Sequence, residues 1–266
     1  MIMRRSLSEF ASLGAIKHTI YIPSVVQQIA NWWPFLLNYI GVKNYGAVYR
    51  LRNGIEIETG EGVDAATIAV VFVKKAYGDA KDNTTIIDIG ANIGVYAVYA
   101  AGTSKNTKVY AYEPLPRSYS LLLKNMQRNR LQKFIFPFRV GVAGSRGRRQ
   151  LFLANGSPFH SFYRTQEGKG HVEIGCITLQ EIFDENNIEQ CDVLKIDCEG
   201  AEFEILLNTP LTYLAKIQEI RMECHDVGGG ELQRARLLAY LKARGFRLVR
   251  FTQDTPTSST WWLQKA

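Results

Sequence analysis

TIIDIGANIG, residues 85–94, decides the fold of this chain, because a run of β-branched apolar residues contains an acid and is followed by two glycines four positions apart. The isoleucines suit a central parallel strand that is covered on both faces. Gly90 and Gly94 remove side chains where the backbone must turn tightly or approach a ligand. The segment predicts a buried strand that turns sharply into a helix over a bound nucleoside.

A second acid predicts that this strand belongs to a βαβ unit. Another short apolar run, residues 108–112, ends at Glu113-Pro114, twenty-five positions after Asp88. An acid at the end of the second strand of such a unit can accept hydrogen bonds from both hydroxyls of a ribose. The chain has neither Gly-x-Gly-x-x-Gly nor a P-loop here, so a ligand with a diphosphate is disfavoured.

A third motif, residues 192–202 (DVLKIDCEGAE), repeats the design in which a strand leads to an acid and a glycine. Asp88 with its two glycines and then Glu113-Pro114 resemble the first two motifs of S-adenosylmethionine-dependent methyltransferases. The three motifs in this order resemble the FkbM family of these enzymes, over residues 46–266. The resemblance implies methyl transfer, usually to a hydroxyl of a sugar or natural product.

Strand-like and helix-like stretches alternate from residue 84 onward, which predicts an α/β fold: a doubly wound, mostly parallel seven-stranded sheet with helices on both faces. The expected strands are 84–89, 108–112, 134–140, 191–196, 216–224, 246–251 and 258–264. The expected helices are 93–102, 115–129, 178–187, 201–208 and 230–244, and residues 144–177 are expected to form an irregular insertion. The last two strands should form an antiparallel edge hairpin, as in Rossmann-like methyltransferases, because only a short polar loop joins them.

The chain before residue 84 predicts smaller attachments. Residues 47–59 alternate around Asn53-Gly54, the strongest two-residue signal for a hairpin turn. A helix is expected over 64–77, with Asp64 as its N-cap. We therefore divide the chain into an N-terminal helical appendage at 1–45, a hairpin and helix at 46–82, and a cofactor-binding domain at 83–266.

Residues 20–40 form an extended apolar stretch that contains two adjacent tryptophans. Prolines and amide side chains interrupt it, whereas a membrane span needs ~20 mostly apolar residues. The order of segments that marks a signal peptide is absent, so we expect a cytoplasmic protein. The stretch would either contact a membrane peripherally as an interfacial helix or pack onto the main domain as a lid, and we favour the lid.

The composition fits one large α/β domain with a small appendage, because 46% of the 266 residues are hydrophobic and 21% are charged. The four cysteines have no Cys-x-x-Cys spacing and the four histidines are scattered, so reduced cysteines and no structural zinc are expected. The net charge of +7 favours an acidic partner only weakly, since the basic residues are dispersed.

The resemblance implies S-adenosylmethionine as the cofactor. Its methionine portion is expected at the first glycine loop, its ribose at the second acid, and its adenine against an apolar pair after the third strand. The expected cofactor residues are Asp88, Gly90, Asn92, Gly94, Glu113, Pro114, Val142 and Ala143. A binding module without catalysis would have lost Asp88, Gly90 or Glu113, and all three are present.

Transfer to a hydroxyl is helped by a general base, which is expected at the carboxyl ends of the strands. Asp197, Glu199 and His225 are the candidates. An imidazole titrates near neutral pH, which favours His225, while an acid near a helix start can instead serve as its cap. The sequence leaves this choice open.

Acceptor contacts are expected around the same strand ends. Glu223 would orient His225 or the acceptor, and Glu202 lies near the same helix start. The family resemblance adds Asp64 and Tyr77, in a segment that closes over the site. The clustered acids could also bind a divalent cation that orients a vicinal diol, and the sequence does not decide this.

A sugar or other small molecule is the expected acceptor. Nucleic acid is disfavoured, because the acids after the fourth strand would repel phosphate and an Asn/Asp-Pro-Pro-aromatic motif is absent there. Glycines and polar residues in the insertion predict a mobile loop with polar contacts; they are Gly156, Ser157, His160, Ser161, Gly168 and Gly170.

Overall fold

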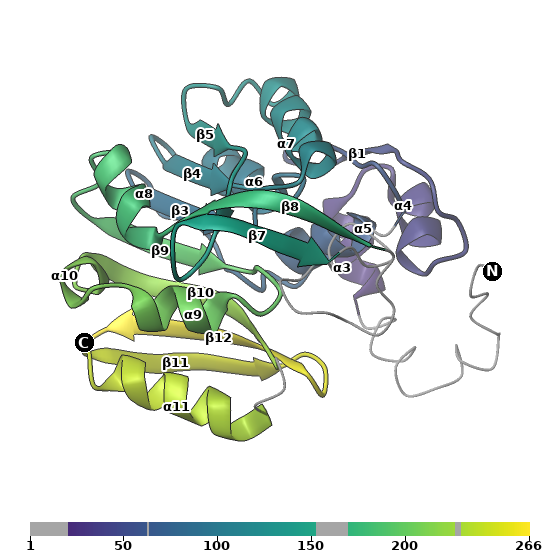
Figure 1. The fold of residues 1–266 in the computed structure, drawn as a ribbon. Helices are drawn as coiled ribbons and strands as arrows, with labels where there is room; N and C mark the ends of the chain where they lie inside the picture. The colour runs from purple at the N-terminus through teal and green to yellow at the C-terminus, as the bar shows by residue number, and fades with distance from the viewer. Residues whose placement is uncertain (1–20, 63, 153–169, 227–229) are drawn as a thin grey trace.

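The computed structural model describes residues 21–62, 64–152, 170–226 and 230–266. Its main layer is a seven-stranded sheet with the order β11-β12-β10-β9-β3-β4-β5 (Figure 1). The strands are β3 (Thr85–Ile89), β4 (Lys108–Tyr112), β5 (Ile135–Phe138), β9 (Cys191–Ile196), β10 (Ile217–His225), β11 (Phe246–Gln253) and β12 (Ser258–Lys265). Neighbouring strands from β10 to β5 are parallel, and β12 is antiparallel to both β10 and β11. The predicted mostly parallel sheet and its antiparallel edge hairpin are confirmed.

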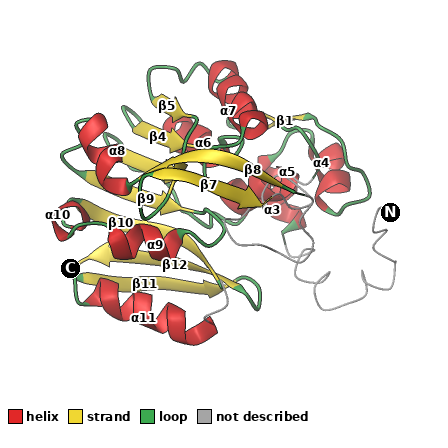
Figure 2. Ribbon diagram, in the orientation of Figure 1, coloured by secondary structure: helices red, strands yellow, loops and turns green. Residues whose placement is uncertain are grey.

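Helices cover both faces of this sheet (Figure 2). They are α6 (Val95–Thr103), α7 (Pro116–Arg128), α8 (Leu179–Glu185), α9 (Glu202–Asn208), α10 (Leu211–Leu214) and α11 (Gly230–Lys242). Because side chains alternate along a strand, Ile86 packs in the core with α6 and α7, whereas Ile87 packs in the core with α8, α9 and α11. Both isoleucines are fully buried. Each burial contributes about 1.5–3 kcal/mol to the folded state.

The turn between β3 and α6 requires glycine for two reasons. Gly90 (φ 75°) and Gly94 (φ 81°) have the left-handed conformation that most side chains disfavour. A Cβ atom on Gly90 would also lie 1.8 Å from the carbonyl oxygen of Asp197. The first and third sequence motifs are therefore joined in space, because the chain after β3 touches the chain after β9.

The N-terminal segment packs onto the domain through α3 (Ile22–Gln28), α4 (Trp32–Tyr39) and the hairpin of β1 (Val48–Arg50) and β2 (Glu56–Glu58). Phe35 of α4 meets Tyr49 of β1 edge to face, with ring centroids 5.1 Å apart. Val25 and Ile29 are buried in the same core. Within the described ranges, no helix is long and apolar enough to cross a membrane.

The helix expected over 64–77 is shorter and of mixed type. α5 (Asp64–Ile68) continues as a π-helix, η1 (Ala69–Val73), in which the N–H of Lys74 donates to the carbonyl of Ala69 at 2.8 Å. Lys75 then takes a positive φ of 49°, so Tyr77 lies in the loop beyond the helix. The expected end was wrong because a π-turn uses the same helix-favouring residues as an α-turn.

The insertion expected to be irregular at 144–177 contains two regular strands. β7 (Gly147–Phe152) and β8 (His171–Ile177) are antiparallel, and β6 (Gly141–Val142) joins β8 in parallel. Charged residues interrupt the alternation of apolar and polar residues that predicts a strand. Two of them, Arg148 of β7 and Glu173 of β8, form an ion pair between the strands at 2.7 Å. Of the residues expected in a mobile loop, Gly170 directly precedes β8, and the others lie outside the described residues.

Candidate active site

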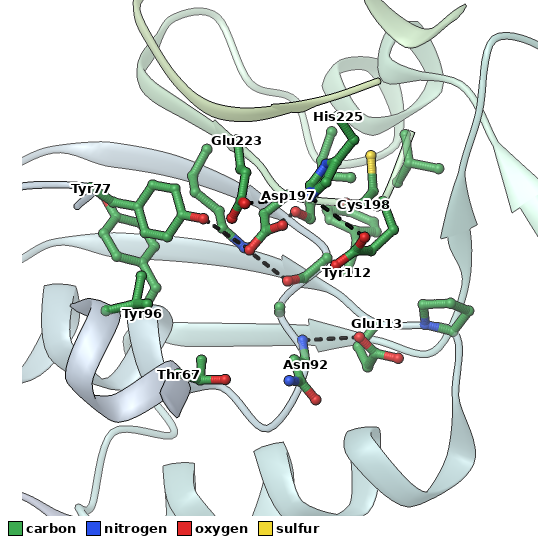
Figure 3. A pocket seen from close by; sticks show the side chains of 18 of the residues that line it. Thr67, Tyr77, Asn92, Tyr96, Tyr112, Glu113, Asp197, Cys198, Glu223 and His225 are labelled. Atoms are coloured by element: carbon green, nitrogen blue, oxygen red, sulfur yellow. Dashed lines mark hydrogen bonds and ion pairs between the residues drawn. The ribbon is translucent and has the colours of Figure 1, made fainter. Parts of the chain in front are cut away.

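A cavity of about 420 Å³ lies at the carboxyl ends of β3, β4, β9 and β10. Its wall includes Gly90, Glu113 and Asp197, which directly follow three of these strands, and Glu223 and His225 at the end of β10 (Figure 3). Parallel strands bring their carboxyl ends to one edge of a sheet, which is where open α/β sheets bind ligands. The volume suits a small-molecule ligand.

Glu113 is fixed by the backbone at one side of the cavity. Its Oε2 accepts from the N–H of Asn92 at 2.9 Å, and its Oε1 accepts from the N–H of Leu115 at 2.8 Å. Burial raises the pKa of this carboxyl group to about 7, although both backbone hydrogen bonds lower it. Figure 3 shows Glu113 and Asn92 opposite Glu223 and His225 across the cavity.

The wall beside Glu113 is apolar and suits a flat ring better than a phosphate. Tyr112, Leu115, Val142 and Leu151 line it. Among the described residues that line the cavity, the side chains that can carry positive charge are Lys195 and His225. These features fit S-adenosylmethionine: the carboxylate can accept hydrogen bonds from the ribose hydroxyls, the apolar wall can contact the adenine, and few cations are needed because the cofactor has no phosphate.

A buried ion pair lies beneath the glycine loop. Lys195 Nζ is 2.9 Å from Asp88 Oδ1, and both side chains are almost completely buried. Burial lowers the pKa of Lys195, but the nearby Asp88 and Asp197 side chains together outweigh this effect and raise the pKa above its usual value. Lys195 also donates to the carbonyl of Gly90 at 2.8 Å, so the pair fixes the loop.

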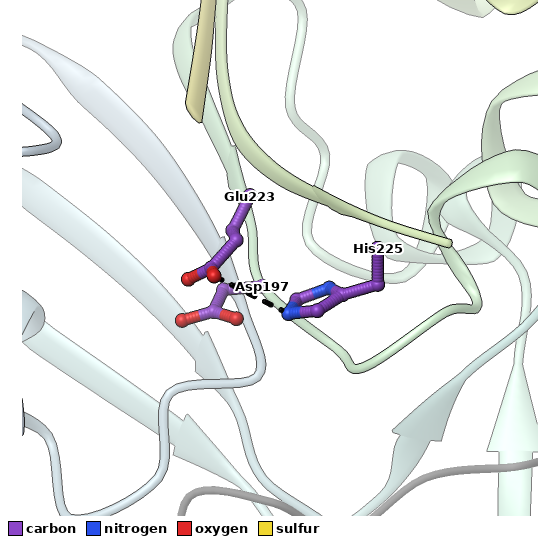
Figure 4. Close-up of side chains that lie close together, drawn as sticks. All are labelled: Asp197, Glu223 and His225. Atoms are coloured by element: carbon purple, nitrogen blue, oxygen red, sulfur yellow. Dashed lines mark ion pairs between the residues drawn. The ribbon is translucent and has the colours of Figure 1, made fainter. Parts of the chain in front are cut away.

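Three side chains from the ends of β9 and β10 meet at the other side of the cavity. One ligand-type atom from each of Asp197, Glu223 and His225 lies within 4.8 Å of the others (Figure 4). His225 Nε2 is 3.4 Å from Glu199 and 3.5 Å from Glu223. The hydroxyl of Tyr77 donates to Asp197 Oδ2 at 2.8 Å.

The environment of His225 raises the pKa of its imidazole above the ordinary value. Its Nδ1 lies 2.9 Å from Oε1 of Glu202, which is fully buried. Burial lowers the pKa of His225, but hydrogen bonds to Glu202 and Glu223 outweigh this and raise the pKa to about 12. Burial raises the pKa of Glu199 to about 8, and the nearby His225 lowers it. These contacts favour the protonated form of the imidazole, in which both ring nitrogens are donors.

Tyr77 is held in place by two residues that the sequence did not reveal. Arg221 of β10 donates to the carbonyl of Tyr77 at 2.7 Å, and the indole N–H of Trp262 donates to the carbonyl of Ala76 at 2.7 Å. A Cβ atom on Gly78 would lie 2.3 Å from the Trp262 ring. Arg221 is one of several polar residues in β10 (IQEIRMECH), so the sequence did not single out this contact.

The residues predicted for the site fall into two groups. Those that line the cavity are Gly90, Asn92, Glu113, Pro114, Val142, Tyr77, Asp197, Glu199, Glu223 and His225. Those that do not line it are Asp64, Asp88, Gly94, Ala143 and Glu202. Lining residues that the sequence analysis missed include Thr67, Tyr96, Lys195, Thr255, Thr257 and Ser258.

The second group has structural positions instead. Asp64 accepts two N–H groups of the preceding loop, at 2.8 and 3.1 Å, so it braces that loop and does not cap the helix. Gly94 packs against Leu122 of α7. Ala143 belongs to a small separate core with Leu151. The sequence motifs predicted where the strands end, but they did not predict which side chains at those ends line the cavity.

Comparison with known proteins identifies the family. The model of the methyltransferase FkbM domain matches residues 88–248, more than half of the chain. The 31-O-demethyl-FK506 methyltransferase FkbM of Streptomyces tacrolimicus is 24% identical over 237 residues, which cover 75% of this chain and 88% of that protein. The hexuronic acid methyltransferase AglP of Haloferax volcanii is 27% identical over 132 residues, which cover 48% of this chain and 51% of that protein.

A solved structure supports the fold. The methyltransferase FkbM of Methylobacillus flagellatus KT is 15% identical and has a TM-score of 0.51, covering 73% of this chain and 47% of that chain. The present chain therefore spans about half of the solved one. The family match, the fold and a cavity at the ends of the three motif strands agree: this chain belongs to the FkbM family of S-adenosylmethionine-dependent methyltransferases.

Proposed function

We propose that this protein is an O-methyltransferase that acts on a hydroxyl group of a sugar, a glycan or a small natural product. The proposal rests on the arrangement of one cavity. Glu113, an acid placed to bind the ribose of a nucleoside, lies at one side, and the hydrogen-bonded pair of Asp197 and Tyr77 lies at the other. The relatives named for 31-O-demethyl-FK506 and for hexuronic acid support an acceptor of this class.

S-adenosylmethionine supplies an electrophilic methyl group when it is bound. Each carboxylate oxygen of Glu113 accepts one backbone N–H and keeps a lone pair for a ribose hydroxyl. Asn92 would contact the methionine portion, and Val142 with Leu115 would contact the adenine. The backbone fixes the Glu113 carboxylate before binding, which lowers the entropy that binding costs.

Asp197 is the proposed base. Tyr77 donates to Oδ2 of Asp197, which fixes the carboxylate and leaves Oδ1 for the proton of the acceptor hydroxyl. His225, with a pKa of about 12, is already protonated at neutral pH. Glu199, with a pKa of about 8, is mostly protonated there too. His225 instead stabilises the neighbouring carboxylates as a cation.

A divalent cation bound by Asp197, Glu223 and His225 is the alternative role for this cluster, because their ligand-type atoms lie within 4.8 Å of one another. A nucleic-acid acceptor is disfavoured, since the same acids would repel its phosphates. Methyl transfer measured with and without EDTA separates a role in metal binding from a role as base.

Mass spectrometry of methyl transfer to a panel of sugars, uronic acids and macrolides tests the proposal. The wild type is expected to methylate an oxygen, and Asp197→Asn should lower the rate by about 10²–10⁴-fold, the usual contribution of a general base. Cofactor affinity should stay within about threefold of wild type, because the substitution keeps shape and hydrogen bonding. Glu189→Gln, at an exposed acid between α8 and β9, is the matched control. An unchanged rate in Asp197→Asn contradicts the assignment.

A further inference from the structure

The loop between β11 and β12, residues 254–257, lies at the same end of the sheet as the carboxyl end of β10 (Figure 1). β12 is antiparallel to β10, and Ser258 at its start is the register partner of His225. The N–H of Asp226 donates to the carbonyl of Thr257 at 2.7 Å, so the loop is tied to the chain that follows β10. The loop therefore lies on the side of the cavity opposite the ribose acid that follows β4.

Hydroxyl groups of this loop and of the start of β12 line the cavity; they belong to Thr255, Thr257 and Ser258. The Oγ1 of Thr255 lies 3.3 Å from the Oγ1 of Thr257 and 3.0 Å from the Oγ of Ser258. Both threonines are exposed, whereas Ser258 is buried. Each hydroxyl offers one O–H donor and two acceptor lone pairs, so these two contacts use two of the three O–H groups. The third O–H and the remaining lone pairs can bind a ligand.

Side chains and backbone fix the loop before a ligand binds. The N–H of Asp254 donates to the carbonyl of Ser258 at 3.1 Å, and the hydroxyl of Thr260 donates to Asp254 Oδ2 at 2.7 Å. Gln253 Nε2 also donates to the carbonyl of Ser258, at 3.0 Å. Hydroxyl groups that are held in place in this way bind a ligand at a lower cost in entropy.

This hydroxyl set suits an uncharged sugar better than a ligand with a carboxylate. A sugar hydroxyl both donates and accepts, as the loop hydroxyls do, whereas a carboxylate only accepts and is bound best by a cation. Among the described lining side chains, those that can carry positive charge are Lys195, which is paired with a buried aspartate, and His225, whose ring nitrogens lie within 3.5 Å of three glutamates. Asp197 and Glu223 in the same wall would repel a carboxylate.

We propose that Thr255 and Thr257 form the acceptor subsite and select an uncharged sugar, whose other hydroxyl groups bind this loop while the hydroxyl to be methylated lies at Asp197. This inference rests on the proposed function and narrows its acceptor class. The loop contacts would be made equally in the bound substrate and in the transition state, so they affect acceptor binding and not the rate of the chemical step.

Steady-state kinetics of methyl transfer tests the subsite with pairs of acceptors. The probes are the methyl glycosides of glucose, galactose and mannose, each beside the methyl glycoside of the corresponding hexuronic acid. The wild type should show a kcat/KM about tenfold or more higher for a neutral sugar than for its hexuronic acid, because the acids of the wall repel the added carboxylate.

Thr257→Val should raise the KM for the neutral sugar by about 2- to 10-fold, the usual effect of losing one uncharged hydrogen bond, with kcat within about twofold of wild type. The affinity for S-adenosylmethionine in titration calorimetry should not change. Thr257→Ser keeps the hydroxyl and should keep the wild-type KM. Thr252→Val is the matched control, since Thr252 is an exposed residue of β11 that does not line the cavity, and it should leave all these values unchanged.

A preference for hexuronic acids, an unchanged KM in Thr257→Val, or methylation of macrolides but of none of the sugars overturns the subsite and leaves the O-methyltransferase proposal standing. Loss of affinity for S-adenosylmethionine in Thr257→Val also overturns it, because the loop would then act on the cofactor or on folding. If a wild type that binds S-adenosylmethionine methylates no acceptor oxygen, the proposed function is removed together with this inference.

Discussion

Glu202→Gln tests how the protonation of His225 arises. Glu202 is fully buried, and its Oε1 lies 2.9 Å from His225 Nδ1, so the substitution removes the charge and keeps the shape. Breaking a buried ion pair costs roughly 3–5 kcal/mol, which corresponds to about 2–4 pKa units. The pKa of His225 should therefore fall from about 12 by that amount.

The same change has a signed effect on stability. The pKa of His225 is higher in the folded state, about 12, than its ordinary value of 6.5. Its contribution to the free energy of unfolding is therefore complete below about pH 6.5 and is lost as the pH rises through about 12. The difference in stability between wild type and Glu202→Gln should be largest at neutral or lower pH and should shrink at alkaline pH.

NMR titration of the histidine ring signals measures the pKa directly. The chain has four histidines, and the spectrum of His225→Gln assigns the relevant signal. Glu204→Gln, a change to a partly exposed acid of the same helix, should leave the titration unchanged. A wild-type pKa near 6.5, or a pKa in Glu202→Gln equal to that of the wild type, would refute the reasoning.

Three further changes test other parts of the structure. Gly90→Ala should destabilise the protein by more than about 3 kcal/mol in denaturant unfolding, because its Cβ would lie 1.8 Å from the Asp197 carbonyl oxygen. The control Gly54→Ala has a positive φ but open space around the new Cβ, so it should cost only about 1–2 kcal/mol. Equal losses of stability in the two variants would contradict the close approach at Gly90. Lys195→Met should cost roughly 3–5 kcal/mol by leaving Asp88 buried and unpaired, and adding Asp88→Leu should recover part of this loss; no recovery would argue against the pair. Tyr77→Phe should slow methyl transfer by about 10- to 150-fold through loss of a hydrogen bond to a charged group, with cofactor affinity unchanged in titration calorimetry; an unaltered rate would remove Tyr77 from the mechanism.

The sheet and the location of the cavity followed from the sequence because both depend on local patterns. Each of the three motifs leads from an apolar run to an acid, which is followed by a glycine in the first and third motifs and by a proline in the second. Parallel strands bring such ends to one edge of the sheet. The strands β7 and β8 of the insertion were missed because charged residues such as Arg148 interrupt the apolar alternation. The two strands are stabilised by pairing with each other, which local sequence patterns do not reveal.

The direction in which each acid points could not be predicted, because it depends on contacts between distant residues. The sequence pattern around Asp88 is also typical of a ligand-binding acid. In the structure, the Asp88 carboxylate instead lies beneath the loop and pairs with Lys195, 107 positions later. His225 has a neutral-pH pKa in isolation, and Glu202 and Glu223 change it. Tyr77 owes its position to Arg221, 144 positions away.

The most direct test of the account is isothermal titration of S-adenosylmethionine into the wild type, Glu113→Ala and Glu189→Ala. The account predicts one binding site per chain, an affinity reduced by about tenfold or more in Glu113→Ala because the hydrogen bonds to the ribose are lost, and no change in Glu189→Ala. Glu113→Ala binding as tightly as the wild type, or a folded wild type that does not bind S-adenosylmethionine, would contradict it.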